Sequence, residues 1–195
     1  METFDLHLDA AHELARTLER KRLRLVLVES CTAGNVAAAL GSVPGISNWL
    51  CGSFVVYRNE SKTQWLGVPR PLLDDPRIGP VSPQVTKMLA QQALAKTPEA
   101  DVSVAVTGHI GPNCPRELDG RVYMTLVRRA AQNESDATVE VSNALQSPAP
   151  VDTQDRARRQ QRLIEATHWV LREIQQAIER PTDAASDNRV RAGLE

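Results

Sequence analysis

Aromatic residues are scarce in this sequence, at 4% of 195 residues, and neither sign of charge dominates. Lysine and arginine together number 23 and aspartate and glutamate 24, so the formal net charge is −1. A nucleic-acid-binding surface ordinarily needs a basic excess, and single-strand binding also needs aromatic stacking platforms. We therefore expect no nucleic-acid partner.

Cysteines are few, and long apolar runs are absent. The three cysteines, Cys31, Cys51 and Cys114, form no C-x-x-C pair, so the sequence indicates neither a disulfide framework nor a zinc site. No apolar run approaches the roughly 18 residues of a membrane span, and the start METFDLHLDAAHELARTLERKR lacks the apolar centre of a signal peptide. We expect a soluble, cytoplasmic protein that binds no membrane, metal or cofactor.

Helical and strand patterns alternate along the chain, which is 42% apolar. Such alternation, with an antiparallel pair of strands late in the chain, predicts a three-layer α/β/α sandwich around a mixed sheet. The predicted strands cover 23–28, 51–57, 101–108, 121–129 and 137–145, and the predicted helices cover 5–21, 33–43, 59–68, 81–97 and 155–180.

Local signals refine this prediction. Asn59 and Ser82 suit the N-caps of two helices, and Pro83 suits a first helical turn. The last two strands are predicted to form a hairpin closed by residues 131–136. We expect a single domain over 1–180, followed by a polar, disordered tail over 181–195.

Three polar stretches follow predicted strands: ESCTAG (29–34), YRNESK (57–62) and TGHIGP (107–112). Ligand sites of α/β folds form at the carboxyl ends of strands, so we expect these stretches to converge. Ser30 would be a nucleophile if a base took its proton. Lys62 is the candidate base, because burial lowers the pKa of a lysine towards neutrality. Tyr57 could relay a proton or orient the pair.

The predicted helix start at Thr32, Ala33 and Gly34 offers a second chemical feature. Free backbone N–H groups and the positive end of the helix dipole would lie there. They suit either an oxyanion or a phosphate, and the sequence leaves that choice open. His109 is the one histidine in a candidate loop.

Each of these residues also has a purely structural interpretation. Ser30 or Thr32 suits a helix N-cap, Cys31 a small buried residue, and Lys62 a solvated surface position. A basic run suits a solvated helix face, although one member could reach a substrate phosphate. Its members are Arg156, Arg158, Arg159 and Arg162.

Five stretches, in order, resemble the motifs of a known family, the C-terminal domain of the competence-damage-inducible protein CinA. The family pattern contains five motifs: A-E-S-C-T-G-G, V-x-Y-S-N-x-x-K-x-x-x-L-G-V, G-A-V-S, A-V-T-G-I-A-G-P and G-D-R. Five stretches of this sequence are similar to them. They are VESCTAG (28–34), VVYRNESKTQWLGV (55–68), GPVS (79–82), AVTGHIGP (105–112) and QDR (154–156). The resemblance spans about residues 5–180, and five ordered motifs are more specific than any one alone.

Stand-alone members of that family act as nicotinamide-nucleotide amidases. The resemblance therefore implies hydrolysis of nicotinamide mononucleotide to nicotinate mononucleotide and ammonia, in pyridine nucleotide salvage, with no metal or cofactor. It implies Ser30 as nucleophile, Lys62 as general base and Tyr57 as the residue that orients them. It also implies substrate contacts at Thr32, Ala33, Gly34, Asn59, Thr107, Gly108 and Arg156, the last a phosphate or ribose contact. A sheet with exposed edges adds the expectation of a homo-oligomer, with a dimer first.

The sequence departs from the family pattern around the candidate site. Ala33 replaces the first glycine of the pair, and Arg58 replaces a serine next to Tyr57. The loop 109–120 is bulkier and more charged than usual, and Gln160 stands where a second arginine is common. These departures also suit a paralogue with a changed substrate, or a catalytically inactive nucleotide-binding or regulatory module. An amidase and a non-catalytic module are therefore the two hypotheses.

Overall fold

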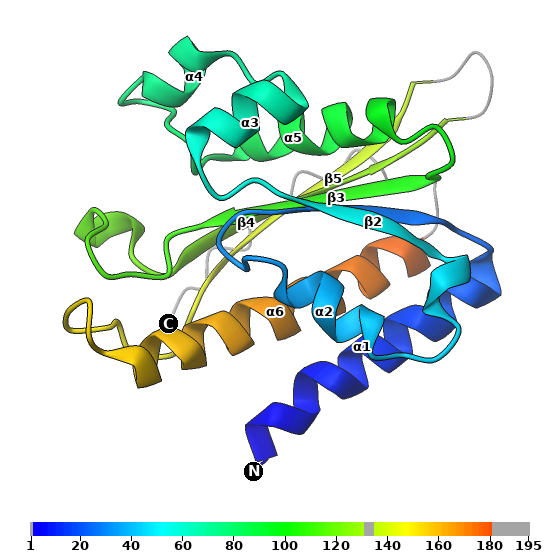
Figure 1. The fold of residues 1–195 in the computed structure, drawn as a ribbon, viewed down its shortest axis with the longest axis horizontal. Helices are drawn as coiled ribbons and strands as arrows, with labels where there is room; N and C mark the ends of the chain where they lie inside the picture. Colours follow the sequence, from blue (N-terminus) through cyan, green and yellow to red (C-terminus); the bar gives the residue numbers. More distant parts are fainter. Residues whose placement is uncertain (1, 131–134, 181–195) are drawn as a thin grey trace.

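Figure 1 shows the fold in a computed structural model that describes residues 2–130 and 135–180. The strands are β1 (Leu25–Glu29), β2 (Leu50–Val55), β3 (Val102–Gly108), β4 (Arg121–Arg128) and β5 (Ala137–Ala144). They form one sheet in the order β2-β1-β3-β4-β5. β1 runs parallel to β2 and β3, whereas β4 is antiparallel to both β3 and β5. The sheet is therefore mixed, as predicted.

Helices cover both faces of the sheet (Figure 1). One layer holds α1 (Glu2–Lys21), α2 (Asn35–Gly41) and α6 (Arg156–Glu179). The other holds α3 (Asn59–Leu66), α4 (Arg70–Asp74) and α5 (Pro83–Lys96). A hydrophobic core lies between each layer and the sheet. The predicted three-layer α/β/α sandwich is confirmed.

The central strand β1 explains why two cores form. Leu25 and Leu27 belong to the core under α1, α2 and α6, whereas Val26 and Val28 belong to the core under α5. Successive side chains of a strand point to opposite faces, so a strand buried on both sides is apolar throughout. This alternation continues past the end of the strand and sends neighbouring polar residues to opposite sides of the sheet.

The helix caps follow the predictions only in part. Ser82 is the N-cap of α5, where its hydroxyl accepts a 3.3 Å hydrogen bond from Val85 N–H. The prediction for Asn59 is wrong, because Arg58 occupies the N-cap of α3 and makes no side-chain capping bond.

Other elements were not predicted. These are α4 and two short 3-10 turns over Ile46–Asn48 and Arg116–Leu118. Part of the predicted hairpin connection, 131–134, and the predicted disordered tail, 181–195, lie outside the described residues. Across the described ranges, none of the helices combines the length and apolar character that crossing a bilayer requires.

Candidate functional site

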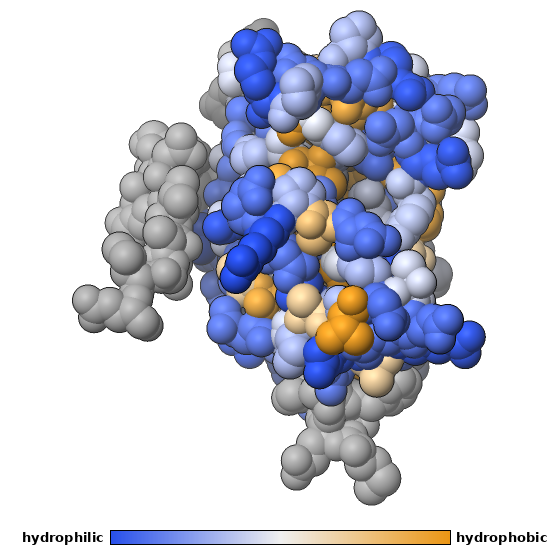
Figure 2. All heavy atoms as spheres, turned by 90° about the vertical axis from the view of Figure 1, so that its left-hand side faces the viewer, coloured by the Kyte–Doolittle hydropathy of each residue, from blue (hydrophilic) through white to orange (hydrophobic). Residues whose placement is uncertain are grey.

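A cavity of about 250 Å³ opens where β1, β2 and β3 end. Its lining comes from the residues after β1, the segment from Tyr57 into α3, the residues before α5, the loop after β3, and Arg159 of α6. The three polar stretches singled out in the sequence therefore converge. Figure 2 views the corresponding side of the molecule, a mostly hydrophilic face with hydrophobic residues visible in its centre.

Ser30 and Lys62 meet at the base of this cavity. Lys62 is 2% exposed and Ser30 is 7% exposed. The Lys62 Nζ donates hydrogen bonds to Ser30 Oγ at 3.2 Å and to the carbonyl oxygen of Val56 at 2.9 Å. The interpretation of Lys62 as a solvated surface lysine is therefore wrong.

The position of Lys62 on α3 explains its burial. Lys62 and Leu66 are the buried residues of this short helix, one turn apart on the face towards the sheet. Burial lowers the pKa of Lys62 from 10.5 to about 8, and the neighbouring Cys31 opposes part of that shift. No carboxylate forms an ion pair with Lys62 among the residues described.

A lysine with this pKa can exchange a proton near neutral pH. At pH 7 about one molecule in ten would carry a neutral Lys62 amine, and the fraction rises to about half near pH 8. A neutral amine within hydrogen-bond reach of a serine hydroxyl can accept its proton and so generate a nucleophile. The pair thus has the geometry and the electrostatics of an activated serine.

Glu29 precedes Ser30 and points to the opposite face of the sheet, where it occupies the start of α2. Its carboxylate oxygens accept hydrogen bonds from Gly34 N–H at 3.0 Å, Val36 N–H at 3.1 Å and Ala37 N–H at 2.9 Å. Ser53 Oγ donates a fourth, at 3.2 Å. The expectation that these N–H groups are free for an oxyanion or a phosphate is therefore wrong, because Glu29 already binds them.

The N-cap interpretation of Ser30 or Thr32 is wrong for the same reason. Gly34 is the N-cap residue of α2, with no side-chain capping bond, and Glu29 bonds the first-turn N–H groups instead. Thr32 is buried, and its Oγ1 has no hydrogen-bond partner within the described part of the chain. Ala33 is exposed with a positive φ of 52°. Thr32, Ala33 and Gly34 all lie outside the cavity lining.

Tyr57 lines the cavity but bonds neither Ser30 nor Lys62 among the hydrogen bonds of the described residues. Tyr57 as a whole is 53% exposed. Its hydroxyl accepts a 2.8 Å hydrogen bond from Arg159 Nη2, and Arg159 Nη1 donates to the carbonyl oxygen of Gly111. Arg156 is exposed and does not line the cavity, so Arg159 is the arginine of the basic run that reaches it.

The loop 109–120 is joined to α6 by a partly buried ion pair that the sequence did not indicate. Arg162 donates from both terminal nitrogens to Asp119, at 2.6 and 2.8 Å, and from Nε to Ser147 O at 3.1 Å. This guanidinium lowers the pKa of Asp119. Cys114 also donates to Asp119, at 3.2 Å. The pair holds the unusual loop in place at the cavity rim.

The remaining predicted site residues divide between the cavity and the core. Asn59 and Gly108 line the cavity. A Cβ at Gly108 would lie 2.9 Å from Cys31 Sγ and 3.1 Å from Arg121 O, so only glycine fits. Thr107 is fully buried outside the lining, and its hydroxyl pairs with that of Thr86 at 2.7 Å.

Two further cavity residues have perturbed side chains. Burial raises the pKa of Cys31 to about 12, which fits its interpretation as a small buried thiol rather than a nucleophile. Burial lowers the pKa of His109. Within residues 2–130 and 135–180, no cluster of His, Cys, Asp and Glu side chains could hold a metal ion.

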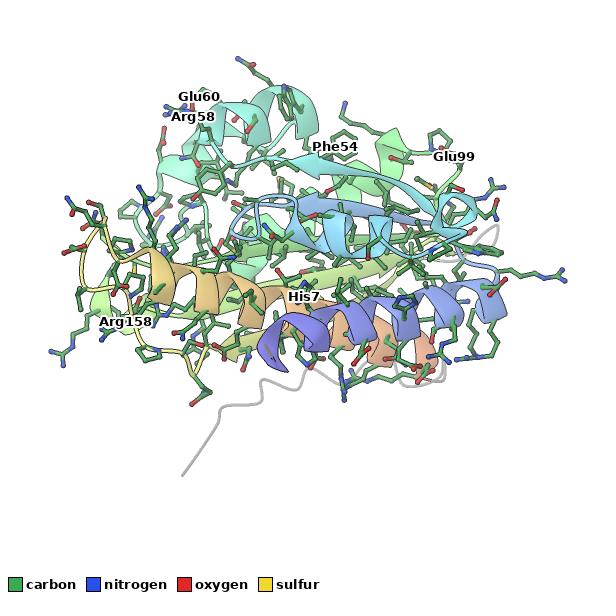
Figure 3. The ribbon with its side chains drawn as sticks, turned by 60° about the horizontal axis from the view of Figure 1, so that its bottom comes forward. His7, Phe54, Arg58, Glu60, Glu99 and Arg158 are labelled. Carbon is green, nitrogen blue, oxygen red and sulfur yellow. The ribbon has the colours of Figure 1, made fainter. Side chains whose placement is uncertain are left out.

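Two of the departures from the family pattern, Arg58 and Gln160, lie outside the cavity lining. Arg58 is 83% exposed and forms a 3.8 Å ion pair with Glu60. Figure 3 shows both side chains at the outer surface, at the start of α3. Gln160 is exposed. These substitutions alter the surroundings of the cavity and leave its base unchanged.

A larger hollow, about 590 Å³, lies between α1 and residues 43–49. Its lining includes Asp9, His12, Glu13 and Trp49, and none of the predicted site residues. Size alone is therefore a poor guide here, because the buried lysine and the serine belong to the smaller cavity.

Comparisons with known proteins identify the family of this fold. The model of the CinA C-terminal domain family matches residues 7–147. A putative competence-damage inducible protein of Symbiobacterium thermophilum is 40% identical over 121 residues, which cover 61% of this chain and 28% of that protein. A namesake from Desulforudis audaxviator is 42% identical over 111 residues, 56% of this chain and 26% of that protein. The matches thus cover less than a third of these relatives.

Solved structures extend the similarity to nearly the whole fold. A competence or damage-inducible protein from Enterobacter asburiae has a TM-score of 0.72 and 25% identity, and the match covers 89% of this chain and 98% of that one. The protein CihA from Agrobacterium tumefaciens has a TM-score of 0.71, 25% identity, and coverage of 90% and 96%. The range that the family model matches, residues 7–147, includes Ser30, Tyr57, Lys62 and Gly108. This chain belongs to the CinA C-terminal domain family.

Proposed function

We propose that this chain is an amidohydrolase that converts nicotinamide mononucleotide to nicotinate mononucleotide and ammonia. The observation that carries the proposal is the buried Lys62 Nζ at 3.2 Å from Ser30 Oγ. The choice of substrate rests on the resemblance of the five motifs to those of nicotinamide-nucleotide amidases.

In the proposed acylation step, neutral Lys62 accepts the proton of the Ser30 hydroxyl while Oγ attacks the carboxamide carbon. The resulting tetrahedral oxyanion collapses and the carbon–nitrogen bond breaks. The Lys62 ammonium gives its proton to the leaving nitrogen, which departs as ammonia. The product of this step is a nicotinoyl ester on Ser30, and Lys62 is again neutral.

In the proposed second step, water hydrolyses that ester. Lys62 accepts a proton from the attacking water, and the ester carbon–oxygen bond breaks as Ser30 Oγ recovers the proton from Lys62. The carboxylic acid leaves as nicotinate mononucleotide. One water is consumed and one ammonia is released in each turnover.

The oxyanion needs hydrogen-bond donors other than the first turn of α2, since Glu29 occupies those N–H groups. The N–H group of Cys31 directly follows the nucleophile, belongs to a residue that lines the cavity, and donates to no backbone carbonyl of the described residues. We assign the oxyanion to this donor. Fixed dipoles of this kind stabilise developing charge more than water does, because they need no reorganisation.

The competing hypothesis is a module that binds a nucleotide without turnover. The residues that motivate it are Ala33, Arg58 and the loop 109–120. Neither Ala33 nor Arg58 lines the cavity, so neither substitution touches the proposed chemistry. Residues 109–114 do line it, so these departures favour an enzyme with a changed substrate over a module without turnover.

Ammonia release from nicotinamide mononucleotide, without added metal, tests the proposal. The native protein and a Ser42→Ala control, altered at an exposed serine far from the cavity, are expected to release ammonia at equal rates. Ser30→Ala is expected to lose at least about 10³-fold in rate, the scale on which removing a nucleophile acts. Hydroxylamine in the native reaction should intercept the ester and yield the hydroxamate.

Two results would reject parts of the proposal. No ammonia from any pyridine-nucleotide amide would reject the amidase and favour the non-catalytic module. Undiminished release by Ser30→Ala would leave an amidase with another nucleophile.

A further inference from the structure

The cavity carries a positive charge that no carboxylate balances. Its lining includes Arg159 and Lys62 and contains no aspartate or glutamate. The arginines on either side of Arg159 in the basic run are paired: Arg158 with Asp155 at 3.5 Å, and Arg162 with Asp119 at 2.6 Å. Arg159 has no such partner among the described residues. A guanidinium without a counter-charge in a cavity attracts an anion.

Two neutral groups hold this guanidinium in place. Tyr57 Oη, from the segment between β2 and α3, accepts from Nη2 at 2.8 Å. The carbonyl oxygen of Gly111, in the loop between β3 and β4, accepts from Nη1. Hydrogen bonds between charged partners are about twice as strong as bonds to neutral acceptors. A phosphate can therefore displace one of these acceptors or bind the remaining N–H donors beside them.

We propose that Arg159 and Tyr57 form one unit that recognises the phosphate of the substrate, separate from the Ser30–Lys62 pair. Arg159 binds the anion, and Tyr57 is a positioning residue that acts through Arg159. The amide chemistry itself rests on the proposed function. The assignment differs from what the motif resemblance implied, namely a phosphate or ribose contact at Arg156 and a Tyr57 that orients the nucleophile and base.

A pair of substrates that differ only in the phosphate tests this unit: nicotinamide mononucleotide and nicotinamide riboside. Both carry the same amide and ribose. The ratio of their kcat/KM values measures phosphate recognition directly. Arg159→Gln is expected to reduce that preference by roughly 10- to 100-fold, the worth of one hydrogen bond to a charged group, through a higher KM for the mononucleotide.

Tyr57→Phe removes only the hydroxyl that holds Arg159. It should reduce the same preference by about 3- to 10-fold, the worth of a neutral hydrogen bond, again through KM. In the double variant the two effects should not add, because both act on one guanidinium. Arg172→Gln is the matched control, since it removes the same charge from an exposed position on α6 about 20 Å further along the helix.

Two kinetic results would overturn the proposal. If Tyr57→Phe lowers kcat equally for both substrates, Tyr57 serves the Ser30–Lys62 pair and not Arg159. If Arg156→Gln abolishes the preference and Arg159→Gln retains it, the phosphate site lies at Arg156.

Binding to the Ser30→Ala variant separates this proposal from the proposed function. Calorimetry with nicotinamide mononucleotide, the riboside and inorganic phosphate needs no turnover. Phosphate-dependent binding that Arg159→Gln weakens would support the unit even if no ammonia were ever released. Turnover with equal binding of mononucleotide and riboside would overturn the unit and leave the amidase intact. Absence of both binding and turnover would reject both.

Discussion

Glu29 and Ser30 are neighbours in the chain, yet they end in opposite kinds of surroundings. Glu29 is fully buried under α2, and four donors saturate its carboxylate. Ser30 turns to the other face, where it meets a buried lysine with only two neutral acceptors. The buried Glu29 carboxylate has a full set of hydrogen-bond donors, whereas the buried Lys62 amine has no opposite charge beside it among the described residues.

The contrast distinguishes Glu29, whose hydrogen bonds stabilise the structure, from Lys62, which can exchange a proton. A carboxylate that bonds several N–H groups secures the path of the chain and has little capacity left for a ligand. An amine that burial has shifted to a pKa of about 8 is poised to exchange its proton. Glu29 thus fixes the turn that presents Ser30, and in the proposed function Lys62 makes the serine reactive.

Replacing Lys62 is the strongest way to break this comparison. Lys62→Met keeps the apolar stem and removes the base, so ammonia release should fall by about 10³-fold or more. The free energy of unfolding at pH 7 should stay the same or rise, because a poorly matched buried amine is replaced by an apolar group. Steady-state rates and urea unfolding measure the two effects.

Lys62 should also make the free energy of unfolding depend on pH, and Lys62→Met should remove that dependence. The pKa of Lys62 is about 8 in the folded protein, against an ordinary lysine value of 10.5. Between these pH values the unfolded chain binds a proton that the folded protein has released. The free energy of unfolding should therefore rise from pH 8 to 10.5, by about 3 kcal/mol from this group. Lys62→Met should lose that rise, whereas Lys96→Met, altered at an exposed lysine, should keep it.

Glu29→Gln tests the structural half of the comparison. Its amide nitrogen would face an N–H donor in place of an oxygen, so at least one buried donor would lose its partner. We expect a loss of about 2 kcal/mol in the free energy of unfolding. Urea unfolding measures it, with Glu19→Gln as the exposed control, expected within about 0.5 kcal/mol of the native protein. A loss of activity without any loss of stability would assign Glu29 a chemical role.

Ala33→Gly is expected to have the smallest effect. Ala33 has a positive φ of 52°, a conformation that is strained for any residue with a Cβ. Glycine should raise the free energy of unfolding by about 1 kcal/mol, read from the urea midpoint, and leave kcat/KM within about twofold. A large gain in activity would instead mean that this position limits the chemistry.

The sequence was sufficient to predict the layers of the fold and the meeting of Ser30 with Lys62. The central strands are apolar enough to be recognised as buried, and polar residues at their carboxyl ends must share one edge of the sheet. The positive φ of Ala33 fits the family pattern, in which a glycine stands at this position.

The contacts that connect distant segments were not predictable. Arg159 reaches Tyr57 across 102 residues, and Arg162 reaches Asp119 across 43. Four arginines share one stretch of α6, and only the direction of each side chain decides which of them enters the cavity. The role of Glu29 was missed because an acidic residue at a strand end resembles any first-turn charge, and the N–H groups that donate to its carboxylate lie at the start of the helix that follows.

The most direct test of the account is the pKa of Lys62 itself. Nuclear magnetic resonance of the protein with ¹³C-labelled lysine ε carbons gives this value, and the signal absent from Lys62→Met identifies the residue. We predict a titration with a pKa near 8, well below the ordinary lysine value of 10.5. A titration near 10.5 would contradict it, because Lys62 would then remain protonated and unable to accept the Ser30 proton.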